Sequence, residues 1–248
     1  MLSLYLVPEE TSLQSGALLT IEGDEAHHIV KVARHRIGER IWVTNGVGVR
    51  ATLLIENASE RQVHGIVESI TIEEVPPVRI RVIQALTKSD RAHECIELLV
   101  AAGVDEIVPW RAERSIGKWD TKASPEKWNQ WIKGAVKQSR RVWIPSCEPY
   151  LEELSLLPES DDELFFAFHE EADASLDSEL LGKWRSRIES ARRVTLIIGP
   201  EGGLSERELA ELERIRIPQL RLGSPVFRSA HAGAIAATAL QATFALWR

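Results

Sequence analysis

The chain has 248 residues, of which 44% are hydrophobic and 27% are charged. This balance is typical of a globular protein and excludes a disordered, collagen-like or disulfide-rich chain. Two cysteines, Cys95 and Cys147, are too few for a disulfide framework or a cysteine zinc site, so a reducing cytoplasm is expected. The first residues lack a basic start, and His231 and Gln241 interrupt the longest apolar stretch. Neither a secretory signal nor a membrane span is therefore predicted.

The net charge of −7 is unevenly distributed along the chain. Residues 1–76 have a net charge of −5, residues 77–150 of +4 and residues 151–248 of −6. A basic middle between acidic flanks is compatible with a surface that contacts a phosphate backbone, and equally with an ordinary solvated face.

The first 75 residues predict a small β-barrel with one helix. Segments with strand character are 2–7, 17–21, 41–44, 49–55 and 62–72. Asp24 is a plausible N-cap for a helix that runs to about His35. His27, Lys31 and Arg34 share one face of that helix, and this face fits either RNA contact or solvation.

Two acids and two prolines at 73–77 predict an extended linker, so we place the domain boundary between residues 75 and 76. After it, strands alternate with helices. The predicted strands are 78–85, 105–108, 164–168, 194–198 and 220–222, and the predicted helices are 90–102, 125–138, 176–188, one from residue 205 and one from residue 228. This alternation predicts an α/β domain at 76–248 with a mostly parallel sheet.

Two strand ends carry a glycine followed by a proline. One is Gly199-Pro200-Glu201-Gly202-Gly203, and the other is Gly223-Ser224-Pro225. Ligands of open α/β sheets lie at the carboxyl ends of strands, where glycine lets a ligand approach the backbone. The carboxylate of Glu201 would repel a phosphate, which favours a neutral or cationic ligand such as an adenosine with a sulfonium. The alternative is a plain tight turn, because Ser205 and Glu208 already form a capping box for the next helix.

Arg228 stands at the start of a final helix made of small residues. The helix dipole disfavours a cation at this end of a helix, so the position of Arg228 indicates a functional use. The alternative is that a salt bridge to an acidic residue stabilises it. The small residues fit either a crowded core or a helix–helix contact in a dimer.

Several segments together resemble one family. They are Leu196-Ile197-Ile198-Gly199-Pro200-Glu201-Gly202-Gly203, Leu220-Arg221-Leu222-Gly223, Val226-Phe227-Arg228-Ser229, Lys88-Ser89-Asp90-Arg91 and Gln138-Ser139-Arg140-Arg141. The chain resembles the small-subunit ribosomal RNA uridine N3-methyltransferases, which are SPOUT-class enzymes with an N-terminal PUA-like barrel. The resemblance implies a trefoil knot in the C-terminal domain, a homodimer, S-adenosylmethionine as cofactor, and one uridine of 16S ribosomal RNA (the position 1498 type) in the small subunit as target. Many members carry Thr-Glu-Thr after the arginine, where this chain has Ser229-Ala230-His231.

The resemblance, taken together with the chemistry of methyl transfer and the positions of basic residues, suggests roles for individual residues. The expected cofactor contacts are Phe168, His169, Glu170, Ile198, Gly199, Pro200, Glu201, Gly202, Leu222, Gly223, Val226 and Phe227. Arg228 is expected to stabilise charge on the uracil, and His231, one helical turn on, to accept the N3 proton; a surface or interface histidine is the alternative for His231. The expected RNA contacts are Lys31, Arg34, Arg36, Lys88, Arg91, Arg114, Arg140 and Arg141. No metal is implied.

Two other functions fit the same sequence. One is a related knotted methyltransferase that acts on transfer RNA or on a ribose 2′-oxygen. The other is an RNA-binding ribosome assembly factor without catalytic activity, which the altered stretch after Arg228 leaves open.

Overall fold

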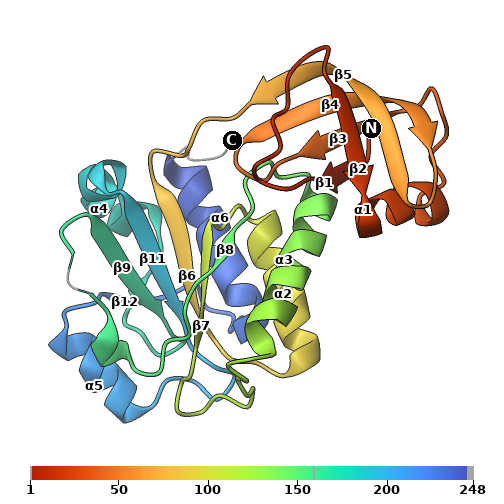
Figure 1. The fold of residues 1–248 in the computed structure, drawn as a ribbon. Helices are drawn as coiled ribbons and strands as arrows, with labels where there is room; N and C mark the ends of the chain where they lie inside the picture. Colours follow the sequence, from red (N-terminus) through yellow and green to blue (C-terminus); the bar gives the residue numbers. More distant parts are fainter. Residues whose placement is uncertain (1, 159, 245–248) are drawn as a thin grey trace. The chain divides into compact units, whose positions relative to one another are not determined.

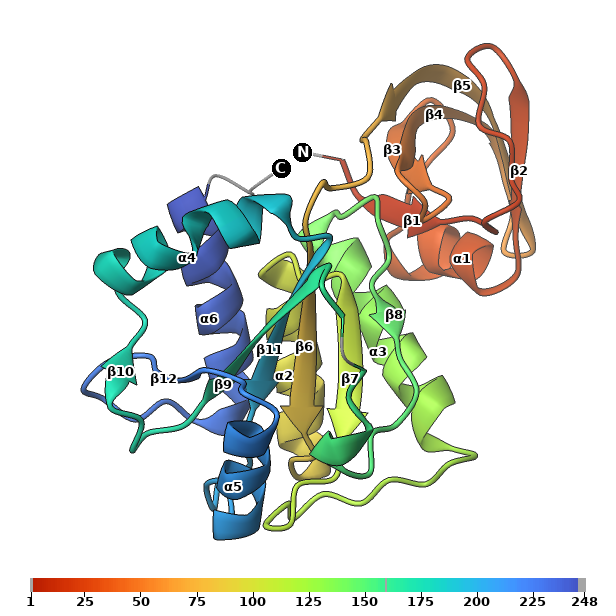
Figure 2. The same ribbon diagram turned by 90° about the vertical axis from the view of Figure 1, so that its left-hand side faces the viewer.

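A computed structural model describes residues 2–158 and 160–244. The chain divides into two compact units (Figures 1 and 2). The first unit combines Met1–Val75 with Val136–Ile144, and the second combines Pro76–Ala135 with Pro145–Arg248. The first unit is therefore built from two separate pieces of the sequence.

The first unit is a curled five-stranded sheet in the order β1-β3-β4-β5-β2 (Figure 2). Its strands are β1 (Leu4–Leu6), β2 (Leu18–Glu22), β3 (Arg40–Thr44), β4 (Val49–Ala58) and β5 (Gln62–Ile72). Only the β1–β3 pair is parallel. Side chains alternate across each strand, so Ile41 and Val43, or Leu53 and Ile55, point together into one apolar core.

The helix of this unit is shorter and less regular than the sequence predicts. It consists of α1 (Gly23–His27) followed by a π-helical turn, His28–Val32. The prediction of Asp24 as the N-cap is wrong, because the cap position is Glu22, whose side chain makes no capping hydrogen bond. Gly23 has φ +66°, so the chain leaves β2 through a left-handed residue, and the cap lies two positions before the predicted one.

Residues 142–144 are fixed to the turn between β3 and β4. The Gly48 amide donates to the Val142 carbonyl at 2.9 Å, and the Ile144 amide donates to the Gly46 carbonyl at 2.9 Å. Gly48 has φ +92°, and a Cβ there would lie 2.4 Å from the Trp143 ring. The turn therefore requires glycine at this position, both for its backbone angle and for the close approach of Trp143.

The second unit contains a parallel seven-stranded sheet in the order β10-β12-β9-β11-β6-β7-β8. Its strands are β6 (Arg79–Ala85), β7 (Glu106–Trp110), β8 (Ser146–Cys147), β9 (Glu163–Phe168), β10 (Ala174–Ser175), β11 (Arg193–Ile198) and β12 (Gln219–Arg221). Its helices are α2 (Ser89–Ala101), α3 (Ser124–Ser139), whose last residues belong to the first unit, α4 (Ser178–Ser190), α5 (Glu206–Arg214) and α6 (Ser229–Phe244), with a 3-10 turn at Leu154–Leu156. This confirms the predicted α/β class and the parallel sheet, while the two-residue strands β8 and β10 are too short to leave a periodic signal.

Helices cover both faces of this sheet. The small-residue helix α6 packs against β6, β11 and α2 (Figure 1), and Ala236 and Ala237 are fully buried. The small residues of α6 thus pack in a crowded core within the chain, as one of the two alternatives predicts. On the other face, Leu212 of α5 joins Ile83 and Ile197 in an apolar cluster.

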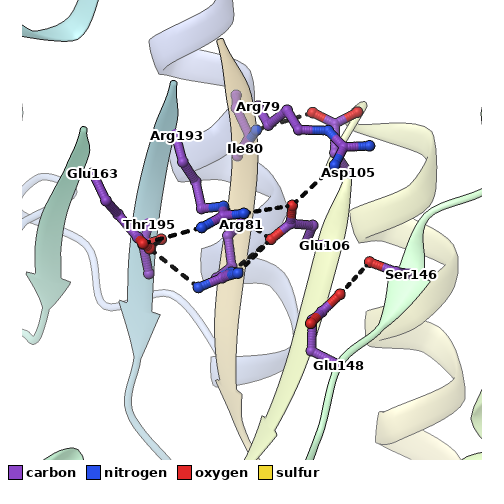
Figure 3. A network of polar contacts seen from close by, with 10 residues as sticks. All are labelled: Arg79, Ile80, Arg81, Asp105, Glu106, Ser146, Glu148, Glu163, Arg193 and Thr195. Atoms are coloured by element: carbon purple, nitrogen blue, oxygen red, sulfur yellow. Dashed lines mark hydrogen bonds and ion pairs between the residues drawn. The ribbon is translucent and has the colours of Figure 1, made fainter. Parts of the chain in front are cut away.

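The amino ends of the central strands carry a buried ionic network instead of apolar residues (Figure 3). Glu106 and Glu163, the first residues of β7 and β9, each have side chains only 3% exposed. Arg81 and Arg193 contact both carboxylates at 2.7–3.2 Å. Arg79 adds a contact to Glu106 at 3.3 Å. Two buried carboxylates therefore share three guanidinium groups.

Candidate active site

A cavity of about 250 Å³ lies at the carboxyl ends of β9, β11 and β12, at the opposite end of the sheet from the ionic network. Its lining residues are 168–170, 198–201, 203–204, 221–229 and 232. Three segments that follow strand ends thus converge on one hollow, the usual position for a ligand in an α/β sheet.

Eleven of the twelve predicted cofactor contacts line this cavity. Among them are Phe168 and His169 from the end of β9, Gly199 from the end of β11, and Leu222 after β12. His169 Nε2 is 3.0 Å from the Gln219 side-chain oxygen, so its ring is fixed to β12. The twelfth residue, Gly202, lies outside the lining, and a Cβ at that position would stand 3.3 Å from Arg114.

Glu208 holds the glycine-rich loop to a neighbouring loop. It completes the capping box of α5, in which Ser205 Oγ accepts from the Glu208 amide and the Ser205 amide donates to Glu208 Oε2 at 2.8 Å. The other carboxylate oxygen accepts from the Glu113 amide at 2.8 Å. The predicted capping box is confirmed, and Glu208 also ties two loops together, which the sequence pattern did not indicate.

Arg114, which the sequence predicts as an RNA contact, binds the same loop. Its Nη1 donates to the carbonyls of Gly202 at 3.0 Å and Leu204 at 3.2 Å. Both bonds stabilise the loop that forms one wall of the cavity.

Ser229, the first residue of α6, links the two glycine-containing loops. Its Oγ donates to the Gly199 carbonyl at 2.6 Å and accepts from Gln84 Nε2 at 3.0 Å. Gln84 is 2% exposed and lies near the carboxyl end of β6. Sequence reasoning missed Gln84, and its only signal is an amide in an otherwise apolar buried strand.

Arg228 lines the cavity and is exposed. Within residues 2–158 and 160–244 its guanidinium has neither an ion pair nor a hydrogen bond, so the alternative of a stabilising salt bridge is not what the structure contains. Phe227 and Val226 beside it are apolar and 38% and 73% exposed. A free cation thus stands next to an exposed apolar edge.

His231 lies one turn further along α6 and outside the cavity lining. Its Nε2 is 3.0 Å from Glu94 Oε1 on α2, and Arg91 Nη1 donates to Glu94 Oε2 at 2.8 Å. The hydrogen bonds from Arg91 and then His231 hold the pKa of the Glu94 carboxyl below its usual range. Glu94 therefore stays ionised at neutral pH, and Arg91, a predicted RNA contact, is paired with it.

The remaining predicted RNA contacts lie on both units: Lys31, Arg34, Arg36, Arg140 and Arg141 on the first, and Lys88 on the second. Lys31 is paired with Glu60 at 2.8 Å. Arg34 and Arg36 are exposed, and Lys88 is exposed immediately before α2. Arg140 has φ +59° and a guanidinium 6.0 Å from the Trp42 ring centroid.

The described residues contain no group of three or more His, Cys, Asp or Glu placed to hold a metal ion. Burial raises the pKa of the Cys95 thiol, with Glu201 adding to the effect, and burial raises that of Cys147 to about 11. Each helix in the described ranges is too short or too polar to cross a membrane.

Two domain families match the chain. An RNA methyltransferase domain matches residues 74–241, and an RNA methyltransferase PUA domain matches residues 21–68. Ribosomal RNA small subunit methyltransferase E of Mycobacterium bovis is 32% identical, over 96% of this chain and 91% of its own length. The enzyme of the same name from Bacillus subtilis is 26% identical over 92% of this chain and 91% of its own length.

Solved structures agree with this assignment. A Legionella pneumophila protein, solved with bound S-adenosylmethionine, has a TM-score of 0.83 and 27% identity, over 98% of both chains. Ribosomal RNA small subunit methyltransferase E of Neisseria gonorrhoeae, also solved with S-adenosylmethionine, shares the fold with a TM-score of 0.84 and 22% identity, over 98% of both chains. Sequence and fold together show that the chain belongs to the ribosomal RNA small subunit methyltransferase E family of SPOUT RNA methyltransferases.

Proposed function

We propose that this enzyme transfers a methyl group from S-adenosylmethionine to N3 of one uridine in the 16S RNA of the small ribosomal subunit, the uridine of the position 1498 type. The observation that carries the proposal is the cavity at the strand ends with the unpaired Arg228 at its edge. In this proposal residues 76–248 carry the methyl transfer, and the PUA-like residues 1–75 contact RNA. A homodimer in the cytoplasm follows from the same family resemblance.

The residues around the cavity fit this cofactor. S-adenosylmethionine, when bound, supplies an electrophilic methyl group on a sulfonium. Glu170 and Glu201 bring carboxylates to the lining, which suits a cationic ligand. Gly199 and Gly223 leave backbone groups open to an adenosine, and Phe168 offers an apolar contact. The relative from Legionella pneumophila was solved with this cofactor, which supports the assignment.

Arg228 is the group that would stabilise the transition state. Loss of the N3 proton places negative charge on O2 and O4 of the uracil, and a guanidinium beside either oxygen lowers the barrier by about 3 kcal/mol. Because Arg228 has no partner in the described residues, it is free to contact the base without first breaking an ion pair.

His231 is the candidate proton acceptor, and Glu94 would orient it. A carboxylate at Nε2 keeps the proton on that nitrogen and leaves Nδ1 as the basic atom. In family members with Thr-Glu-Thr after the arginine a carboxylate lies within this stretch; here Glu94 on α2 brings a carboxylate to His231 from another helix.

The test is methyl transfer from labelled S-adenosylmethionine to small ribosomal subunits that lack the modification, followed by nucleoside analysis. Label in 3-methyluridine is the expected result. Label in another base or in a 2′-O-methyl nucleoside would discard the assumed target. Absence of label from subunits and from transfer RNA, with the cofactor still bound, would favour an assembly factor.

Arg228→Ala separates catalysis from cofactor binding. We expect methyl transfer to fall by at least about 100-fold, with unchanged affinity for S-adenosylmethionine measured by calorimetry. Arg192→Ala is a matched control, because it removes the same charge from an 86% exposed side chain at the other end of the sheet. A collapse of cofactor affinity in Arg228→Ala would show that Arg228 serves the cofactor and not the uracil.

A further inference from the structure

Two guanidinium groups of the first unit gather at one tryptophan. The Arg50 guanidinium carbon lies 4.4 Å from the Trp42 ring centroid, and that of Arg140 lies 6.0 Å from it. Trp42 is on β3 between Ile41 and Val43, which are fully buried. Since side chains alternate across a strand, Trp42 projects from the opposite side of β3. Both guanidinium groups lie near its ring on that side.

Both arginines are held in place by the backbone. Arg50 pairs with Thr44 across β3 and β4, which puts it diagonal to Trp42. Arg140 precedes the residues fixed to the β3–β4 turn, where Thr44 and Gly48 both donate to the Val142 carbonyl. This path includes a left-handed backbone at Arg140, with φ +59°. Arg140 directly follows the last residue of α3, and a left-handed residue there is a common way for a helix to end, so the helix end fixes the backbone of Arg140.

Within the described residues, neither Arg50 nor Arg140 has an ion pair. By contrast Arg40, on the same strand as Trp42, is bound by both oxygens of Glu68 at 2.7 and 2.8 Å. Both guanidinium groups lie near the same ring, which places two positive charges on one side of β3.

We propose that Arg50 and Arg140, positioned by Trp42, form a binding site for phosphates of the RNA backbone. The inference rests on the proposed function, since the RNA substrate supplies the anion. It adds Arg50 and Trp42 to an RNA contact that sequence resemblance indicated only through Arg140. A guanidinium over a ring keeps its N–H edge free, and that edge matches the oxygens of a phosphate. The competing interpretation is that an RNA base stacks on Trp42. It is less favoured because Arg50 already occupies part of the ring surface.

The first experiment measures binding to unmodified small ribosomal subunits over a series of salt concentrations. Arg50→Gln and Arg140→Gln should each weaken binding several-fold and reduce the slope of log affinity against log salt by about 0.7–0.9, the value for one lost phosphate contact. Arg40→Gln is the matched control, because it loses the same charge from a paired side chain on β3. Slopes and affinities equal to those of the control would overturn the proposal.

Arg140→Gly distinguishes an RNA contact from a structural role. Glycine accepts φ +59° without strain, so this variant should unfold at the same or a higher temperature while binding subunits more weakly. Lower thermal stability with unchanged binding would contradict the proposed role.

Trp42→Leu, made alone and in the Arg50→Gln/Arg140→Gln double variant, separates positioning from stacking. If Trp42 only positions the arginines, Trp42→Leu weakens subunit binding in the otherwise wild-type protein and has no effect in the double variant. An equal loss in both backgrounds would assign Trp42 to a base instead. Wild-type methyl transfer is measured in parallel. If the wild type transfers methyl groups while the variants bind like the control, only this inference fails, whereas failure of the wild type to transfer or to bind removes the proposed function.

Discussion

Replacement of Glu106 tests how the second unit tolerates charge in its sheet. Glu106→Gln keeps the size of the side chain but removes the charge that three guanidinium groups share. Arg81 and Arg193 would then keep their contacts to Glu163, and Arg79 would lose its contact to Glu106. The network would change from one excess positive charge to two.

The expected cost follows from burial. Removing one partner of a fully buried ion pair costs about 3–5 kcal/mol. Glu106 is 3% exposed, but Arg79 and Arg193 are 44% and 30% exposed and can regain water, so we expect about 2–4 kcal/mol. Arg79→Gln is the comparison, with an expected loss below about 1 kcal/mol, because it removes a single contact of a half-exposed side chain.

Urea unfolding followed by circular dichroism measures both variants, and equal m values would show that the midpoints report stability alone. A Glu106→Gln loss no larger than that of Arg79→Gln would refute this reasoning. It would mean that water, not the carboxylate, solvates the arginines at the amino ends of the strands.

Three further variants test the loops and the first unit. Ser229→Ala should cost about 1–3 kcal/mol and weaken S-adenosylmethionine binding in calorimetry, because it removes the hydroxyl that joins both cavity loops. Glu208→Ala should cost about 2–3 kcal/mol in urea unfolding and also weaken cofactor binding, since it loses the helix cap and leaves two amides unpaired. Gly48→Ala should lower the melting temperature strongly or prevent soluble expression, because its methyl group would overlap Trp143. Gly16→Ala, at φ +82° in open space, should show only the smaller backbone penalty, and similar losses in both would contradict the steric argument.

The sequence predicts the fold of this protein well where periodicity is strong. Strands and helices of the second unit alternate as expected, because buried parallel strands are apolar throughout and the capping box marks the start of α5. The start of α1 differs from the prediction because Gly23 adopts a positive φ, which the helix pattern does not indicate. The trefoil knot stays a prediction from resemblance, since no periodicity encodes the path of a chain through itself.

The candidate site divides in the same way. Glycine and proline after two strands indicated the loops that meet at the cavity. Gln84 and Arg114 act on those loops from elsewhere in the sequence, and no local pattern indicated these contacts. Glu94 likewise comes close to His231 only through the packing of α2 against α6. Such contacts depend on tertiary structure, so a spacing rule cannot reveal them.

The division of the first unit into two pieces has a consequence for protein synthesis. Residues 136–144 complete this unit, so the β3–β4 turn has no partner until that segment leaves the ribosome. Domains usually fold during translation in order from the N-terminus. Here the apolar core of the first unit comes entirely from residues 5–67, but the β3–β4 turn must wait for more than half of the chain, and throughout that interval the glycine positions that receive Trp143 and Ile144 stay uncovered.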